Sequence, residues 1–160
     1  MRRILSLAVA VVASLAIAGT ALAAITFHSG PTVTFSGNTA TATFNVSGLG
    51  NDPAQATLDI SGTETFGCVN HGNNPAPGHP QTVDADGSTT APLTKSEKNG
   101  RSTVTVTATL SATPPTASDL GCPNANWGVR LISASVITAT LTIEQPIGTI
   151  IYGPATFTNQ

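Results

Sequence analysis

The sequence predicts an all-β fold, an antiparallel β-sandwich of immunoglobulin-like size with about seven to nine strands and one disulfide. Three observations support this prediction. Apolar and polar residues alternate with a period of two over much of the chain. Turn-forming residues separate these runs. The only two cysteines, Cys68 and Cys122, occur in a chain that begins with an export signal. A small β-barrel is the alternative arrangement of the same strands.

The export signal occupies residues 1–23. Arg2 and Arg3 are followed by an apolar run at 4–17 and by small residues that end in an Ala-x-Ala pattern. This order is typical of a secretory signal peptide, and we expect cleavage after Ala23. The apolar run is shorter than the roughly 20 residues of a transmembrane helix. We therefore expect a secreted, extracellular protein whose mature chain, 24–160, is a single domain without a membrane span.

The strand pattern is clearest at 39–46 and 102–112. In the second run Val104, Val106, Ala108 and Leu110 share one face, and threonines occupy the other. Branched side chains such as valine and threonine suit a pleated, half-buried surface. Further strands are expected at 32–36, 55–65, 127–144, and 147–152 with 155–158. The 127–144 segment is too long for one straight strand, so it forms two strands or one bent strand with a bulge at 133–135.

Glycine and proline residues indicate where strands end. Gly153-Pro154 interrupts the last strand, which suits an edge position because proline cannot donate a ladder hydrogen bond. Asp86-Gly87 is expected in a turn, and Asn99-Gly100 is a candidate hairpin turn. No window has sustained helical spacing outside the export signal.

The two cysteines each lie in a segment rich in Pro, Asn and Gly. In an oxidising compartment pairing is the default, so we expect a Cys68–Cys122 disulfide, with two free thiols as the alternative. The bond would close a loop of about 54 residues and stabilise the fold by about 4 kcal/mol in the chain-entropy model. It would also bring the loops at 67–82 and 118–127 together at one end of the sandwich.

Charge is sparse and mildly acidic. Charged residues make up 9% of the chain, and the formal net charge is −2. Nucleic-acid binding needs clustered Lys and Arg, and no such cluster occurs. We therefore expect no nucleic-acid partner. Arg130 is expected to cap a strand edge or to pair with an acid.

Several short motifs occur together in the mature chain. They are Gly48-Leu49-Gly50-Asn51, Cys68-Val69-Asn70 followed by Gly72-Asn73, Pro75 and Pro77-Gly78, Lys98-Asn99-Gly100, and Gly121-Cys122-Pro123-Asn124 with Trp127. As a set they resemble an uncharacterised family of small exported bacterial β-domain proteins. The resemblance implies a secreted β-domain and brings no activity, substrate or catalytic residue with it.

Metal binding has weak support in the sequence. His71 and His79 share one loop, but zinc needs three or four ligands and no third ligand is obvious. Asp84-Ala85-Asp86-Gly87 resembles the opening of a calcium loop but lacks the later ligands, so a turn is the better interpretation. We expect no metal and no cofactor.

Catalytic motifs are also missing from the sequence. Two carboxylates could flank a glycosidic bond, but nothing selects a pair among Asp59, Glu64 and Glu144. No Gly-x-Ser-x-Gly elbow of a hydrolase occurs. We therefore expect no enzyme activity, and a small secreted hydrolase remains an alternative.

The two cysteine loops are the expected recognition site, since loops held by a rigid scaffold commonly bind ligands. The candidate binding residues in these loops are Asn70, His71, His79, Asn124, Asn126 and Trp127. Trp127 either packs over the disulfide or is exposed in a binding surface. The predicted function is a non-enzymatic structural or binding module for an extracellular protein or glycan. A self-assembling cell-surface or matrix component is the other alternative.

Overall fold

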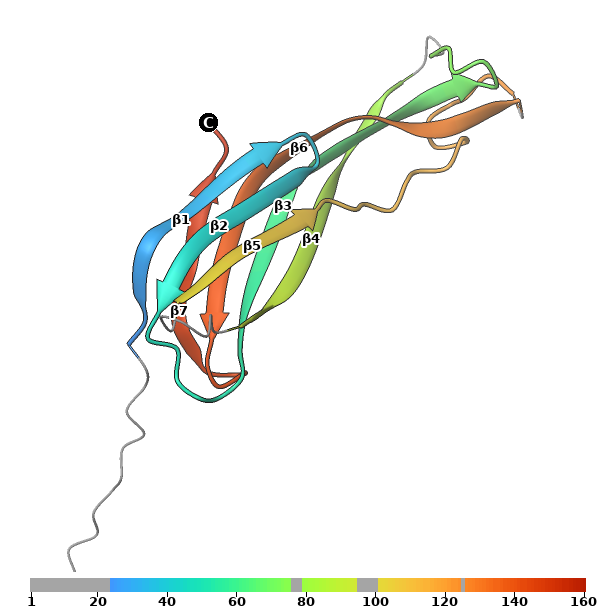
Figure 1. Ribbon diagram of the computed structural model, residues 1–160. Helices are drawn as coiled ribbons and strands as arrows, with labels where there is room; N and C mark the ends of the chain where they lie inside the picture. Colours follow the sequence, from blue (N-terminus) through green and yellow to red (C-terminus); the bar gives the residue numbers. More distant parts are fainter. Residues whose placement is uncertain (1–23, 76–78, 95–100, 125) are drawn as a thin grey trace, which may run out of the picture.

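The computed structural model describes residues 24–75, 79–94, 101–124 and 126–160. The expected signal peptide and the Asn99-Gly100 turn lie outside these residues. Within them, seven strands form two antiparallel sheets that face each other as a β-sandwich, which confirms the predicted fold (Figure 1). In the same residues no helix is long and apolar enough to cross a membrane.

The two sheets differ in size. The three-stranded sheet has the order β1 (Thr26–Ser36), β2 (Thr39–Ser47) and β5 (Arg101–Thr109). The four-stranded sheet has the order β4 (Gln81–Leu93), β3 (Ala54–Asn70), β6 (Trp127–Glu144) and β7 (Ile150–Thr158). All neighbouring strands are antiparallel.

The period of two sorts side chains between the core and solvent. In β5, Val104, Val106 and Ala108 are buried, and the threonines between them are exposed. The largest fully buried side chains between the sheets come from both of them: Phe44, Val46, Leu58, Val106, Val136, Leu141 and Ile143. Because water is excluded between the sheets, burial of this apolar surface is the main force that holds them together.

The outer faces of both sheets are coated with hydroxyl groups. Thr41 and Thr107 are hydrogen-bonded across neighbouring strands at 2.9 Å, and Ser61 and Thr138 at 2.7 Å. Cross-strand pairs of this kind stabilise a sheet and make its solvent face polar without adding charge.

The four-stranded sheet continues beyond the three-stranded sheet, and β3, β4 and β6 carry this distal extension (Figure 1). The strand expected at 55–65 was therefore too short. β3 runs to Asn70 because its last residues pair with the start of β6, where Cys68 lies opposite Val129. Cys68 is thus a strand residue, and its expected position in a loop was wrong.

β6 is one bent strand, which confirms one of the two alternatives for 127–144. Its pairing with β3 shifts twice, and β6 has the extra residue at each shift, Ile132 and Ile137. The two bulges flank the expected position at 133–135. Bulges bend a strand and increase its twist, so they change the direction of β6 where it passes from the distal extension into the sandwich.

β4 was not expected from the sequence, and the turn predicted at Asp86-Gly87 was wrong. Both residues pair with β3, Asp86 opposite Ser61 and Gly87 opposite Ile60. Glycine is required at position 87 for a reason other than a turn. A Cβ at Gly87 would lie 2.1 Å from the carbonyl oxygen of Thr109, so the end of β5 crosses β4 too closely for any side chain.

The end of the sandwich opposite the disulfide is held by a buried amide. Gln145 Oε1 accepts a hydrogen bond from the Gly50 N–H at 2.8 Å, and its Nε2 donates to the Asp52 carbonyl at 2.7 Å. Both bonds fix the 48–53 loop against the end of β6. β7 lies at a sheet edge, as predicted from Gly153-Pro154.

Gly87→Ala should lower the free energy of unfolding by about 1–3 kcal/mol, because the new methyl group overlaps backbone that cannot move cheaply. The matched control is Gly128→Ala in β6, where nothing lies within 4 Å of the added Cβ. The control should change stability by less than about 0.5 kcal/mol. Urea denaturation measures both, and equal effects would show that close approach does not explain Gly87.

Candidate functional site

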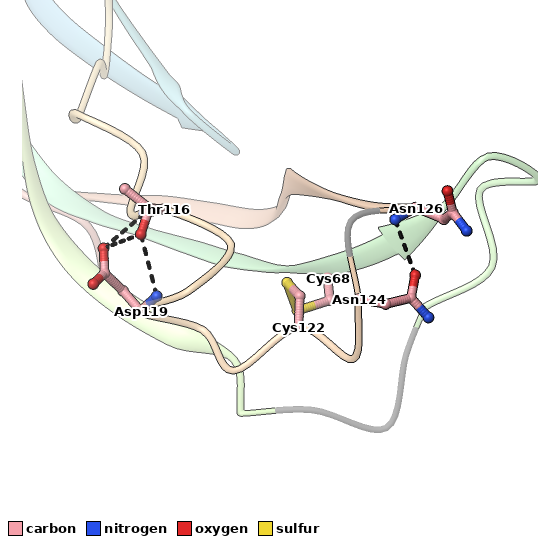
Figure 2. Close-up of a disulfide and its surroundings, with 6 residues drawn as sticks. All are labelled: Cys68, Thr116, Asp119, Cys122, Asn124 and Asn126. Atoms are coloured by element: carbon pink, nitrogen blue, oxygen red, sulfur yellow. Dashed lines mark hydrogen bonds between the residues drawn. A yellow bond between two sulfur atoms is a disulfide. The ribbon is translucent and has the colours of Figure 1, made fainter.

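A disulfide fastens the segment after β5 to the distal extension. Cys68 and Cys122 are joined, with their Cα atoms 5.6 Å apart, so the predicted pairing is confirmed. Figure 2 shows the bond between β3 and the segment that leads to β6. Among the described residues no second sheet faces the distal extension, and this segment, which we call the covering segment, packs against its inner surface instead.

A small second core lies between the covering segment and the distal extension. Phe66, Cys68 and Leu120 are its buried members, and Leu120 is only 1% exposed. The partly buried side chains packed against them are Val83, Ala112, Cys122, Trp127 and Val129. The distal end is thus packed by its own apolar contacts as well as by the covalent bond.

A single tight turn places Leu120 and Cys122, and Thr116 and Asp119 begin it (Figure 2). The Asp119 carboxylate accepts hydrogen bonds from the Thr116 N–H at 2.9 Å and hydroxyl at 2.6 Å. In return the Asp119 N–H donates to the Thr116 hydroxyl oxygen at 3.2 Å. This reciprocal pattern satisfies the N–H groups at the start of a helical turn.

Gly121 ends the same turn in a left-handed conformation, with a φ of 63°. Its N–H donates to the Ser118 carbonyl at 3.0 Å, and the Cys122 N–H donates to the Ala117 carbonyl at 2.9 Å. This pair of bonds is the Schellman arrangement that glycine favours. Thr116-x-x-Asp119 followed by Gly121 is a sequence signal for such a turn, and it was missed.

A buried carboxylate of β3 binds the beginning of the covering segment after β5. Glu64 is 4% exposed, and its Oε2 accepts a hydrogen bond from the Ala112 N–H at 3.0 Å. The other acids considered for catalysis lie elsewhere. Asp59 accepts a bond from Ser88 on the outer face, and Glu144 accepts one from Gln55 toward the opposite end. These three carboxylates do not face a common cleft.

Asn70 organises the loop that follows β3. Its Oδ1 accepts hydrogen bonds from the Gly72 N–H at 2.9 Å and the Asn74 N–H at 3.0 Å. Asn73, in the same loop, adopts a left-handed φ of 60° that asparagine tolerates better than most residues. The side chain of Asn70 therefore shapes the loop as well as the site.

Asn124 shapes the segment on the other side of the site. Its Oδ1 accepts a hydrogen bond from the Asn126 N–H at 2.9 Å (Figure 2). Its backbone carbonyl accepts one from the Trp127 N–H at 3.1 Å. The turn directs the chain into β6, so Asn124 positions Asn126 and Trp127.

The two segments enclose an open pocket of about 370 Å³ at the distal end, which we call the tip pocket. It is lined by Val69, Asn70, His71, Asn73, Asn126, Trp127 and Gly128. The candidate residues Asn70, His71, Asn126 and Trp127 are therefore brought together. Asn124 supports the pocket without lining it, and His79 is exposed and lies outside it. Trp127 lines the pocket and also packs against the small core.

Sequence reasoning missed Asn73 and the role of Arg130. Arg130 donates a hydrogen bond from Nη1 to Asn73 Oδ1, so its partner is an amide and not an acid. The contact fixes one amide of the pocket from β6. An asparagine near the end of a turn-rich loop was the available signal for Asn73, since the loop needs a left-handed residue.

The pocket lining is polar and partly aromatic. Among the described residues it offers amides, an indole and an imidazole but no carboxylate, and the Arg130 guanidinium adjoins it through Asn73. Over the described residues, no three His, Cys, Asp or Glu side chains lie close enough to hold a metal ion. Comparisons of the chain with protein-family models, curated proteins and solved structures find no match. The function is therefore argued from the geometry of the pocket.

Replacing both cysteines, Cys68→Ala with Cys122→Ala, should lower the free energy of unfolding by about 4 kcal/mol. The distal end, which has only its small core, should then unfold before the sandwich. Trp127 is the only tryptophan and lies at that end, so its fluorescence reports the loss. In the variant the fluorescence transition should precede the circular-dichroism transition in urea, whereas the disulfide-bonded protein should give coincident curves. Coincident curves in the variant would show that the distal end does not unfold separately from the sandwich.

Asp119 should make the covering turn sensitive to acid. The Thr116 hydroxyl, and then the Thr116 N–H, lower the pKa of Asp119 below its ordinary value of 3.8. A lowered folded pKa means that the ionised carboxylate stabilises the turn at and above pH 3.8, and that this contribution is lost as pH falls through the folded pKa. The protection of the Thr116 amide, which is its exchange rate relative to that of an unfolded peptide at the same pH, should fall over that range. In Asp119→Asn this protection should no longer depend on pH.

Proposed function

We propose that the protein is an exported, non-enzymatic binding module and that the tip pocket binds a neutral carbohydrate. One observation carries the proposal. An indole, an imidazole and several amides line an open pocket at the disulfide-tied end of the sandwich. The Cys68–Cys122 bond also supports export, because structural disulfides persist in oxidising compartments.

The lining matches the chemistry of a sugar ring. A carboxamide offers two N–H donors and a carbonyl acceptor, which complement the hydroxyl groups of a sugar. Asn73 already accepts a bond from Arg130, so its amide nitrogen is directed to other acceptors. Trp127 adds a flat apolar surface on which the C–H groups of a pyranose can lie, and an indole N–H donor. Among the residues that the structure describes, no carboxylate lines the pocket to favour a cation.

The pocket is held in shape before a ligand arrives. Asn70 and Asn124 each fix a turn through their side-chain oxygens, and Arg130 fixes Asn73. The disulfide holds the two segments against each other. A site that is already ordered loses less conformational entropy on binding, so modest contacts suffice for affinity.

Fluorescence titration of the mature protein with neutral oligosaccharides of glucose, N-acetylglucosamine and mannose tests the proposal. Trp127 is the only tryptophan, so binding at the pocket should change its emission directly. Calorimetry should show that Trp127→Ala weakens binding by about 2 kcal/mol, or roughly 30-fold, as expected for a central aromatic contact. Asn126→Ala should also weaken it.

The matched control is Asn74→Ala, which alters the same loop but not the pocket lining. Because Trp127 also packs against the small core, Trp127→Phe and near-ultraviolet circular dichroism separate lost contacts from lost folding. Oligosaccharide binding that survives both Asn126→Ala and Trp127→Ala would reject the tip pocket. Capture of an extracellular protein that these variants abolish, with no sugar bound, would retain the pocket and reject the ligand class.

A further inference from the structure

Among the described residues, the edge of β5 that faces away from β2 is unpaired over Thr103–Thr107, and β4 meets it only from Thr109 onward. In the same part of the chain, the only sheet partner of β5 is β2. The Leu110 N–H donates to the Asn38 carbonyl at 2.8 Å. Successive residues of an antiparallel strand direct their N–H and C=O groups to opposite sides. The backbone N–H and C=O groups of Thr103, Thr105 and Thr107 therefore point away from β2. The Ser111 N–H agrees with this alternation, since it turns to the Asp86 carbonyl of β4 at 3.0 Å.

The other outer strands carry features that discourage pairing. β1 contains Pro31 and β7 contains Pro154, and the pairing register shifts in both strands. β4 contains acidic residues, a glycine and a proline. By contrast, β5 from 102 to 109 is regular and has no proline, glycine or charge. A long unprotected edge is a ready template for another strand.

We propose that β5 pairs with β5 of a second copy of this chain, antiparallel and centred on Thr105. This register places Thr105 opposite its own copy, Thr103 opposite Thr107, and Val104 opposite Val106. In this register each residue whose N–H and C=O groups face outward lies opposite another such residue. The two strands can therefore exchange backbone hydrogen bonds across the interface. The two three-stranded sheets become one continuous sheet.

A second copy fits this edge because the strand is self-complementary. Residues 103–107 read Thr-Val-Thr-Val-Thr, which is the same in both directions. The outer face would repeat the threonine pairing already present between Thr41 and Thr107. The inner face would continue the buried valine row of Val104 and Val106. The pairing covers Thr103–Thr107 and stops before Thr109, whose carbonyl lies against Gly87 of β4.

Sedimentation of the mature protein over a concentration series tests this pairing. We expect a weak, reversible dimer. Thr105→Lys and Thr105→Glu should each abolish it, because like charges would face each other at the centre of the interface. An equimolar mixture of the two variants should restore a dimer, since opposite charges then meet. Thr32→Lys, at the other edge of the same sheet, is the matched control and should dimerise normally.

A monomer at millimolar concentration, an unaffected Thr105→Lys dimer, or a mixture that stays monomeric would each overturn the proposal. Amide exchange gives a second measurement. The amides of Thr103, Thr105 and Thr107 should be protected only in the dimer, whereas those of Val104 and Val106 already bond to β2. β5 lies in the sandwich and not in the distal extension that carries the tip pocket (Figure 1). Thr105→Lys should therefore leave oligosaccharide binding unchanged.

Discussion

The pairing of β3 with β6 is the interaction on which the rest of the structure depends. The two strands bond from Gln55 opposite Glu144 to Asn70 opposite Trp127, and they pass from the sandwich into the distal extension. The same ladder therefore supports the main core and the end that carries the tip pocket. Because the two bulges lie between these parts, the ladder can change direction without being broken.

The distal end shows how a sheet can be covered without a second sheet. The segment after β5 is attached to the distal extension in three ways: Glu64 binds the Ala112 amide, Leu120 fills the small core, and Cys122 is bonded to Cys68. Each attachment uses a different kind of interaction. The segment then delivers the chain to the asparagine turn before β6, so the covering of an apolar surface and the shaping of a site are achieved by the same residues.

The alternation of valine, alanine and threonine was sufficient to predict β2, β5, most of β3 and the sandwich, because it reports directly which face is buried. The disulfide followed from the export signal. β4 was missed because Asp84, Asp86 and Gly87 have low strand propensity, and long-range pairing with β3 overrode it. The pocket was only partly predictable. Its segments were identified, but the role of Asn73 depends on Arg130, which is distant in sequence.

The hydroxyl coat of the two sheets has a consequence for the medium in which the protein can exist. Threonine and serine pairs hydrate the surface without ionising, and charged residues are only 9% of the chain. Dissolved ions therefore have few Coulombic contacts to screen. The stability of the fold should therefore change little with ionic strength, from dilute buffer to concentrated salt.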